Sequence, residues 1–180
     1  MKKLWFRAAL TAAMVMTFAG STRTRASEDD VPISAHLRGL GEVPPTNSKG
    51  TAEFQGKISA DGTSITFTLK WSGLTTLPLF SHIHFGPTKE TGGVMVFLCG
   101  GGGKPACTQA TSGQASGTIT AGDIVGPAPQ GIEPAPAGQF ADVIRAILTS
   151  NAYVNLHTTR FPPGEVRGPV VAQRDDEGDN

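Results

Sequence analysis

Charged residues, aromatic residues and cysteines are all scarce in this sequence. Of its 180 residues, 17% are charged and 7% are aromatic, and two are cysteines. No stretch concentrates lysine and arginine into a basic surface, which argues against nucleic acid as a partner. We find no Gly-x-Ser-x-Gly elbow, no phosphate-binding glycine loop and no nucleophile with an evident base. We therefore predict no catalytic residue and favour a protein that is not an enzyme.

A long apolar run is also missing after the first 20 residues. Near the start, three basic residues precede an apolar run from Ala8 to Ala19, and small and polar residues follow. This pattern predicts a secretory signal peptide over residues 1–26, cleaved between Gly20 and Ala26. The run is too short for a membrane anchor, which needs about 20 apolar residues. We expect a secreted or periplasmic protein with no membrane span after cleavage.

Removal of residues 1–26 would make the chain acidic. That segment holds five basic and no acidic residues, so 15 basic against 15 acidic residues becomes 10 against 15. Seven acidic residues lie near the ends: Glu28, Asp29, Asp30, Asp175, Asp176, Glu177 and Asp179. Acidic terminal runs are usually solvated, so we expect a disordered acidic tail over 173–180. The segment 31–172 has the size of one domain.

Alternation of apolar and polar residues predicts a mainly β domain. Strands are expected over 31–37, 51–59, 65–71, 82–86, 94–98 and 115–120. Asp61-Gly62 predicts a hairpin turn, and the continuously apolar segment 94–98 predicts a central strand buried on both faces. The stretch 72–80 is expected to be a connection.

One helix is predicted among these strands. Apolar residues recur at i, i+3, i+4 and i+7 from Phe140 to Ile147, and Leu148 widens the apolar stripe. We expect the helix to end near Ser150 and Asn151, with Asn151 in the left-handed conformation.

The last part of the domain predicts a β-hairpin. One strand runs from Tyr153 to Thr158, a Pro-Pro-Gly turn follows, and the second strand runs from Glu165 to Val171. Side chains two apart in a strand share a face. Glu165 and Arg167 are therefore expected to form an ion pair or to hold a loop backbone, and Asn155 to anchor a loop or turn. These roles are structural, not catalytic.

The two cysteines, Cys99 and Cys107, are eight residues apart in a glycine-rich segment. In an exported chain this favours a disulfide. The alternative is a redox-active or metal-binding thiol pair, although the spacing matches no Cys-x-x-Cys motif.

Three histidines form a candidate metal site. His82 and His84 share one face of a strand, and His157 occupies the corresponding face of another. If these strands are neighbours, three imidazoles converge, a ligand set that suits copper or zinc. Alternatively, the imidazoles donate hydrogen bonds to loop carbonyls or to Glu165 and Glu42 and hold no metal. The fourth histidine, His36, is expected at the surface.

Four separated motifs, in this order, resemble the CHRD domain, which is named after chordin. They are Gly41-Glu-Val-Pro-Pro45, His82-Ile-His84-x-Gly86, Tyr153-Val-Asn-Leu-His157-Thr and Gly164-Glu-Val-Arg-Gly168. The resemblance covers Ile33 to Val171 and implies an immunoglobulin-like Greek-key β-sandwich, distantly similar to copper/zinc superoxide dismutases. It implies no established activity. The His-x-His strand looks like the metal-binding strand of those dismutases, but four histidines are too few for their second, zinc site.

Two functional hypotheses follow. The first is a secreted, non-catalytic binding or structural module whose partner is an extracellular protein or ligand. The second is a mononuclear copper- or zinc-binding protein, a carrier or a weak redox enzyme, that uses His82, His84 and His157. No cofactor is certain from the sequence, and metal content separates the two hypotheses.

Overall fold

A computed structural model describes residues 29–136 and 138–173. The predicted signal peptide and nearly all of the predicted tail lie outside these residues. The described strands are β1 Val31–Arg38, β2 Thr51–Ile58, β3 Ser64–Ser72, β4 Pro78–Phe85, β5 Gly93–Cys99, β6 Gly113–Thr120, β7 Ala152–Thr158, β8 Val166–Pro169 and β9 Val171–Ala172. The helix α1 spans Phe140–Leu148, and three short 3-10 helices span Gly39–Gly41, Ala121–Asp123 and Ala128–Gln130.

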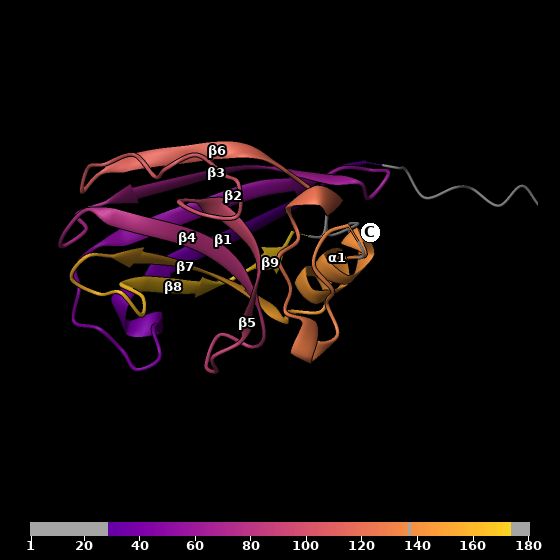
Figure 1. Cartoon of the computed structure of the whole chain (residues 1–180). Helices are drawn as coiled ribbons and strands as arrows, with labels where there is room; N and C mark the ends of the chain where they lie inside the picture. Colours follow the sequence, from indigo (N-terminus) through magenta and orange to yellow (C-terminus); the bar gives the residue numbers. More distant parts are fainter. Residues whose placement is uncertain (1–28, 137, 174–180) are drawn as a thin grey trace, which may run out of the picture.

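The strands form one antiparallel sheet that folds over on itself (Figure 1). Its order is β5-β4-β7-β8-β1-β2-β3-β6, with β9 also pairing with β1. β1 pairs with β2 along its whole length, whereas it meets β8 only where Arg38 opposes Arg167. The sheet therefore divides at this junction into two layers, and the described residues form a barrel-like Greek-key sandwich with one short helix. The predicted fold class is confirmed.

The core lies between the two layers. Leu37, Phe54 and Leu69 come from β1, β2 and β3, and Ile83 and Leu156 come from β4 and β7; all five are fully buried. Period-two alternation produces this arrangement, because every second side chain of a strand points to the same face. Burial of one such side chain contributes about 1.5–3 kcal/mol to folding.

The helix α1 occupies the predicted residues, but two predicted details of it are wrong. Phe140, Val143 and Ile147 are buried, whereas Leu148 is 41% exposed. At 100° per residue, Leu148 lies about 120° from the centre of the apolar stripe, so it faces away from the core. The left-handed residue after the helix is Ser150, with φ 60°, and not Asn151.

The strand β5 is not the central strand that its apolar sequence predicts. It is the last strand at one end of the sheet order and pairs only with β4. A loop covers its other edge, where Val96 forms an isolated bridge with Ile124 and Val125 donates to the carbonyl of Met95. The apolar sequence of β5 is therefore explained by a covering loop and not by a second neighbouring strand. The predicted connection 72–80 is also too long, because β4 begins at Pro78.

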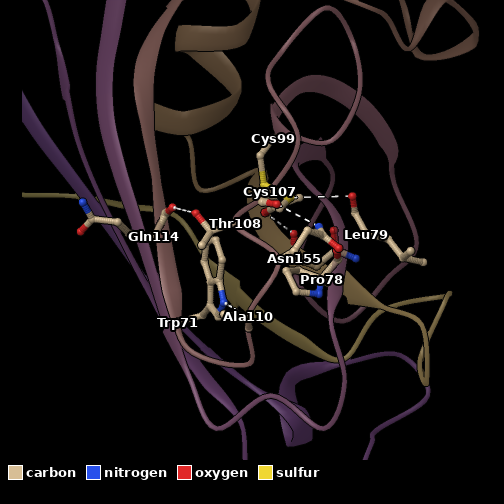
Figure 2. The surroundings of a disulfide bond; sticks show 11 residues. Trp71, Pro78, Leu79, Cys99, Cys107, Thr108, Ala110, Gln114 and Asn155 are labelled. Atoms are coloured by element: carbon tan, nitrogen blue, oxygen red, sulfur yellow. Dashed lines mark hydrogen bonds between the residues drawn. A yellow bond between two sulfur atoms is a disulfide. The ribbon is translucent and has the colours of Figure 1, made fainter.

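Cys99 and Cys107 form the predicted disulfide, with a sulfur–sulfur distance of 2.01 Å (Figure 2). The bond closes the glycine-rich loop that follows β5. Within this loop, Lys104 donates to the carbonyl of Thr118 in β6 at 2.7 Å and pairs with Asp123 at 2.7 Å. The loop thus links the two end strands of the sheet, which do not pair with each other.

Replacing both cysteines by serine (C99S/C107S) should lower the free energy of unfolding by about 2.5 kcal/mol, the loop-entropy value for a loop of this length. Urea unfolding with and without a reductant measures this loss. Reduced wild-type protein should match the double variant, which serves as the control. A midpoint that neither reduction nor the substitutions change would contradict the prediction.

Candidate functional site

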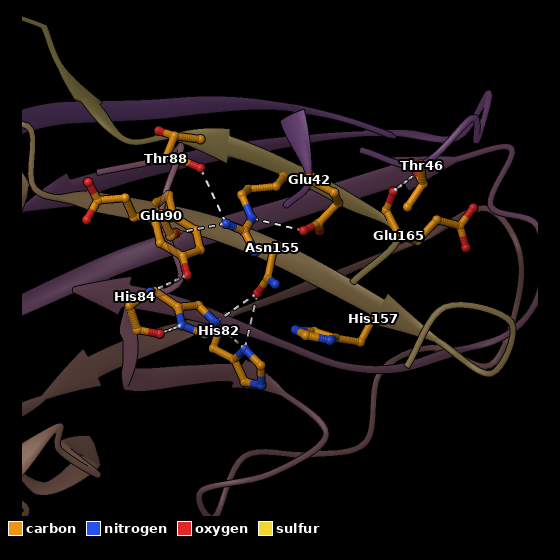
Figure 3. Close-up of polar contacts among 12 residues, drawn as sticks. Glu42, Thr46, His82, His84, Thr88, Glu90, Asn155, His157 and Glu165 are labelled. Atoms are coloured by element: carbon orange, nitrogen blue, oxygen red, sulfur yellow. Dashed lines mark hydrogen bonds and ion pairs between the residues drawn. The ribbon is translucent and has the colours of Figure 1, made fainter. Parts of the chain in front are cut away.

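The outer face of β4, β7 and β8 carries a layer of buried polar and aromatic side chains, which we call the polar layer (Figure 3). Its members are His82, His84, Tyr153, Asn155, His157, Glu165 and Arg167. Loops cover this face and supply hydrogen-bond partners, so every residue of β7 is buried although only one of its faces meets the apolar core.

Three histidines of the polar layer lie together. β4 and β7 are neighbouring antiparallel strands in which His82 opposes Asn155, two residues from His157. The side chains of His82, His84 and His157 are only 5–7% exposed. One nitrogen of each ring lies within 4.8 Å of the corresponding nitrogens of the other two. The structure therefore brings the three imidazoles together.

Backbone carbonyls fix the orientation of two of these rings. Nδ1 of His84 lies 2.9 Å from the carbonyl oxygen of Gly92, and Nδ1 of His157 lies 2.8 Å from that of Pro162. A carbonyl oxygen only accepts, so each Nδ1 carries the proton and donates. In the neutral ring, Nε2 then keeps its lone pair. Metal-binding histidines are usually oriented by hydrogen bonds of this kind.

Two lone pairs, those of His84 Nε2 and His157 Nε2, point into the cluster. Nε2 of His84 lies 3.0 Å from Nδ1 of His82, which donates to it in the neutral pair. Nε2 of His157 is buried and has no hydrogen-bond partner among the described residues. An ion bound at about 2.0–2.1 Å by three imidazole nitrogens requires nitrogen separations of about 3.3–3.5 Å. The nitrogens of His82 and His84 already lie closer than this, at 3.0 Å, and His157, within 4.8 Å of both, would have to approach them.

Asn155 was expected to anchor a loop or turn, but its side chain instead contacts the cluster from within β7. Its amide oxygen lies 3.3 Å from Nδ1 of His82 and 3.0 Å from Nε2 of His84. Without metal, the proton on Nδ1 of His82 can be donated either to this amide oxygen or to Nε2 of His84. Asn155 therefore contacts one ring nitrogen of His82 and one of His84.

Aromatic rings surround the imidazoles. Phe80 packs against His157 at 4.6 Å between ring centroids, and Phe97 meets His82 edge-on at 4.6 Å. Tyr153 lies parallel to His84 at 4.7 Å. Phe97 is itself held by Gly101 and Gly102, where any side chain would collide with its ring. The disulfide-closed loop thus keeps apolar rings against the histidines.

A buried ion pair lies beside the histidines. Nε of Arg167 donates to Glu42 at 2.9 Å, and its guanidinium also donates to the carbonyls of Thr88 and Glu90. Desolvation raises the pKa of Glu42 to about 7, although Arg167 acts to lower it. The second carboxylate oxygen of Glu42 is buried without a hydrogen-bond partner among the described residues. It lies where a side chain at Gly164 would be, which requires glycine there.

Glu165 and Arg167 do not pair with each other. Oε1 of Glu165 accepts from Ser48 at 2.6 Å and from the backbone N–H of Thr75 at 2.7 Å. Its other oxygen accepts from Thr158 at 2.6 Å. Glu165 thus joins two loops to β7, whereas Arg167 joins the Glu42 loop to the loop after β4. The histidines donate to carbonyls and form no hydrogen bond with either glutamate.

The architecture and the motifs agree with one known family, whose sequence pattern matches residues 33–170. The chain belongs to the CHRD domain family. The match includes every member of the polar layer and covers most of the chain. Membership of the CHRD family supports an extracellular binding or structural module. No curated protein matches the chain. Among the described residues of this CHRD domain, no helix has the length and apolar character needed to cross a membrane.

The three clustered histidines of the CHRD domain are held neutral at pH 7 by lowered pKa values. Burial lowers the pKa of His82 to about 3, and the neighbouring imidazoles add to this effect. Burial also lowers the pKa of His157 to about 4 and lowers the pKa of His84. Neutral imidazole is the form that binds metal. The fourth histidine, His36, lies at the surface, 4.0 Å from Glu53 and apart from the cluster.

Sequence reasoning missed the partner of Arg167 in this CHRD domain. Glu42 was considered only as an acceptor for the imidazoles, yet it is buried and pairs with Arg167. The sequence carries one signal for it. A single acidic residue, Glu42, precedes Val-Pro-Pro, and because the two prolines already interrupt strand pairing, the acidic residue is not needed for that purpose. The aromatic neighbours Phe80 and Phe97 were missed because cross-strand contacts on this face depend on the register.

Without metal, the CHRD domain should lose stability as the pH falls from 7 to 4. The ordinary pKa of histidine is 6.5, so His82 and His157 become protonated below about pH 6.5 in the unfolded chain. In the folded chain their pKa values are about 3 and about 4, so they stay unprotonated until the pH is much lower. Acid therefore favours unfolding in this window. Glu42 acts oppositely, because its folded pKa of about 7 exceeds its ordinary 4.5, but it is one group against two.

Urea midpoints at pH 7, 5.5 and 4 measure this dependence. The variant H82A/H157A should show a shallower pH dependence and Glu42→Gln a steeper one, whereas His36→Ala should follow the wild type. If the wild type and H82A/H157A changed in parallel with pH, the two histidines would not be the cause.

Proposed function

We propose that this CHRD domain is an extracellular, non-catalytic module that binds one copper or zinc ion. The proposed ligand atoms are Nδ1 of His82, Nε2 of His84 and Nε2 of His157, and His82 would bind as the tautomer that carries its proton on Nε2. The observation that carries the proposal is the Nε2 of His157, which is buried, keeps a lone pair and lacks a hydrogen-bond partner among the described residues. A buried acceptor without a partner costs about 1–3 kcal/mol, and a bound cation would satisfy it.

The surroundings support a built site. Two rings are pre-oriented by carbonyl acceptors, all three are neutral, and aromatic rings limit their movement. Three imidazole nitrogens suit copper or zinc. A metal bound by His84 and His157 would connect, through these residues, the loops at Gly92 and Pro162 that cover the polar layer.

Metal titration of untagged protein tests this proposal. The protein should bind about one equivalent of Cu²⁺ or Zn²⁺, measured by elemental analysis after removal of free metal. His157→Ala should weaken binding at least tenfold because it removes one of three ligands. His36→Ala is the matched control, since it removes the remaining histidine of the chain, and it should bind like the wild type. Equal binding by both variants would contradict the proposed site.

A purely structural role is the second candidate, and two hydrogen bonds favour it. His84 holds the loop at Gly92 and His157 holds the loop at Pro162 without any metal. If the wild type binds no metal while His157→Ala is less stable, the histidines are loop anchors. The module would then act through a surface that recognises an extracellular protein.

We also propose that residues 1–26 direct export and are removed. The mature protein, recovered from the periplasm or the medium, should begin between residues 21 and 27 by N-terminal sequencing. Leu10→Arg, which interrupts the apolar run, should leave the precursor uncleaved, whereas Lys70→Arg should be processed normally. An exported protein that retains Met1 would contradict this proposal.

A further inference from the structure

We infer that the three-histidine site prefers Cu(I) to the divalent ions Cu(II) and Zn(II), and that Arg167 sets this preference. The inference rests on the proposed metal site and specifies its ion. It depends on the charges around the ligands, on the rigidity of those charges and on the space that the aromatic rings leave.

The ligand set brings no negative charge to the ion. All three proposed donors are neutral imidazoles, and the neighbouring Asn155 is a neutral amide. A positive charge lies beside them, because the guanidinium of Arg167 packs on the ring of Tyr153 and that ring packs on His84. Moving a +2 ion into a buried site costs more than moving a +1 ion, and an adjacent cation increases that difference.

The geometry holds the positive charge in a fixed place. Cζ of Arg167 lies 4.4 Å from the centroid of the Tyr153 ring, and the opposite partner of that ring is His84, parallel to it at 4.7 Å. Carbonyls of Thr88 and Glu90 and the carboxylate of Glu42 hold the guanidinium. Arg167 therefore forms a layered contact with a ligand ring and cannot swing to solvent without breaking these bonds.

The two buried carboxylates compensate this charge only in part. Glu42 pairs with Arg167, but desolvation raises its pKa to about 7, so near neutral pH a substantial fraction of it is protonated. Glu165 directs its oxygens to Ser48, Thr75 and Thr158. Within residues 29–136 and 138–173, no carboxylate forms a hydrogen bond with the three imidazoles.

The space around the ligands also favours a low coordination number. Phe80 and Phe97 pack directly against His82 and His157, and the rings are only 5–7% exposed. Cu(I) is stable with three nitrogens in a plane. Cu(II) and Zn(II) require at least a fourth ligand, normally water or hydroxide, with its own hydrogen bonds. The rings of Phe80 and Phe97 supply no such hydrogen bonds.

The first test uses wild-type protein loaded with copper. A mediated redox titration should give a Cu(II)/Cu(I) reduction potential above that of the aqueous ion, because the site stabilises the lower charge. Anaerobic competition with chromophoric chelators should give a lower dissociation constant for Cu(I) than for Zn(II). A potential at or below that of the aqueous couple would overturn the inference.

Two variants test the role of Arg167 at pH 8, where Glu42, whose pKa is about 7, is mostly ionised. Glu42→Gln leaves Arg167 uncompensated, whereas E42Q/R167Q removes both charges. A unit charge about 10 Å away changes the affinity for a +2 ion relative to a +1 ion by about tenfold at an effective dielectric constant of about 20. The Zn(II)-to-Cu(I) affinity ratio should fall about tenfold in Glu42→Gln and return to about the wild-type value in E42Q/R167Q, because the double variant loses one charge of each sign.

The matched control is Glu53→Gln, which makes the same charge change at an exposed position of β2 and should alter the ratio less than twofold. Equal ratios in Glu42→Gln and the double variant would overturn the role of Arg167. If the double variant does not fold, Glu42→Gln and the wild-type potential still decide. Failure of the wild type to bind any of the three ions would refute the proposed function, whereas tight Zn(II) binding with a low copper potential would refute this inference alone.

Discussion

The structure depends on the burial of both faces of β7. All seven residues of this strand are buried, with Val154 and Leu156 in the apolar core and Tyr153, Asn155 and His157 in the polar layer. An apolar face needs only a partner surface, whereas a buried polar face needs a hydrogen-bond partner for each group. Loops must therefore close over β4, β7 and β8 with their backbone groups correctly placed. This requirement accounts for the loops 39–50, 73–77 and 86–92, each of which supplies hydrogen-bond partners to this face.

Each member of the polar layer meets this requirement in its own way. Glu165 accepts from side chains and a backbone N–H, Arg167 donates to carbonyls and to Glu42, and two histidines donate to carbonyls. In the part of the chain that the structure describes, two buried side-chain atoms lack hydrogen-bond partners, Oε1 of Glu42 and Nε2 of His157. The first belongs to a group whose pKa is raised to about 7, so a proton can neutralise it. The second is a base that stays unprotonated and is open to a Lewis acid.

Much of the fold could be predicted because local pattern and tertiary structure agree. The alternation in β1 to β3, the Asp61-Gly62 turn and the amphipathic pattern of α1 each depend on residues close in sequence, and all three predictions are confirmed. The position of β5 could not be predicted, because a loop and a neighbouring strand bury an apolar run equally well. Leu148 and Ser150 show the same limit at the scale of single residues, where the direction of one side chain or one φ angle decides the outcome.

The sequence predicts which residues form the candidate site, but not the protonation state and hydrogen bonds of their individual nitrogen atoms. The spacing of His82 and His84 fixes a common face, and the strand pairing of β4 with β7 then brings in His157. The sequence does not say which ring nitrogen carries the proton, because Gly92 and Pro162 reach the rings from loops whose paths depend on the whole fold. The same holds for Glu42, which meets Arg167 across 125 residues of chain.

The distance along the chain between the histidine-bearing strands has a consequence for folding order. His82 and Asn155 are 73 residues apart in sequence, and β5, β6, the disulfide loop and α1 all lie between them. Contacts of such high sequence separation form late, after the loop-closure entropy has been overcome. An unfolded chain therefore offers only the local His82-x-His84 pair, and the three-nitrogen cluster exists only once β4 and β7 have paired. An ion held by all three nitrogens would bind the native state more tightly than the unfolded chain, and that difference in binding free energy would appear as thermodynamic stability.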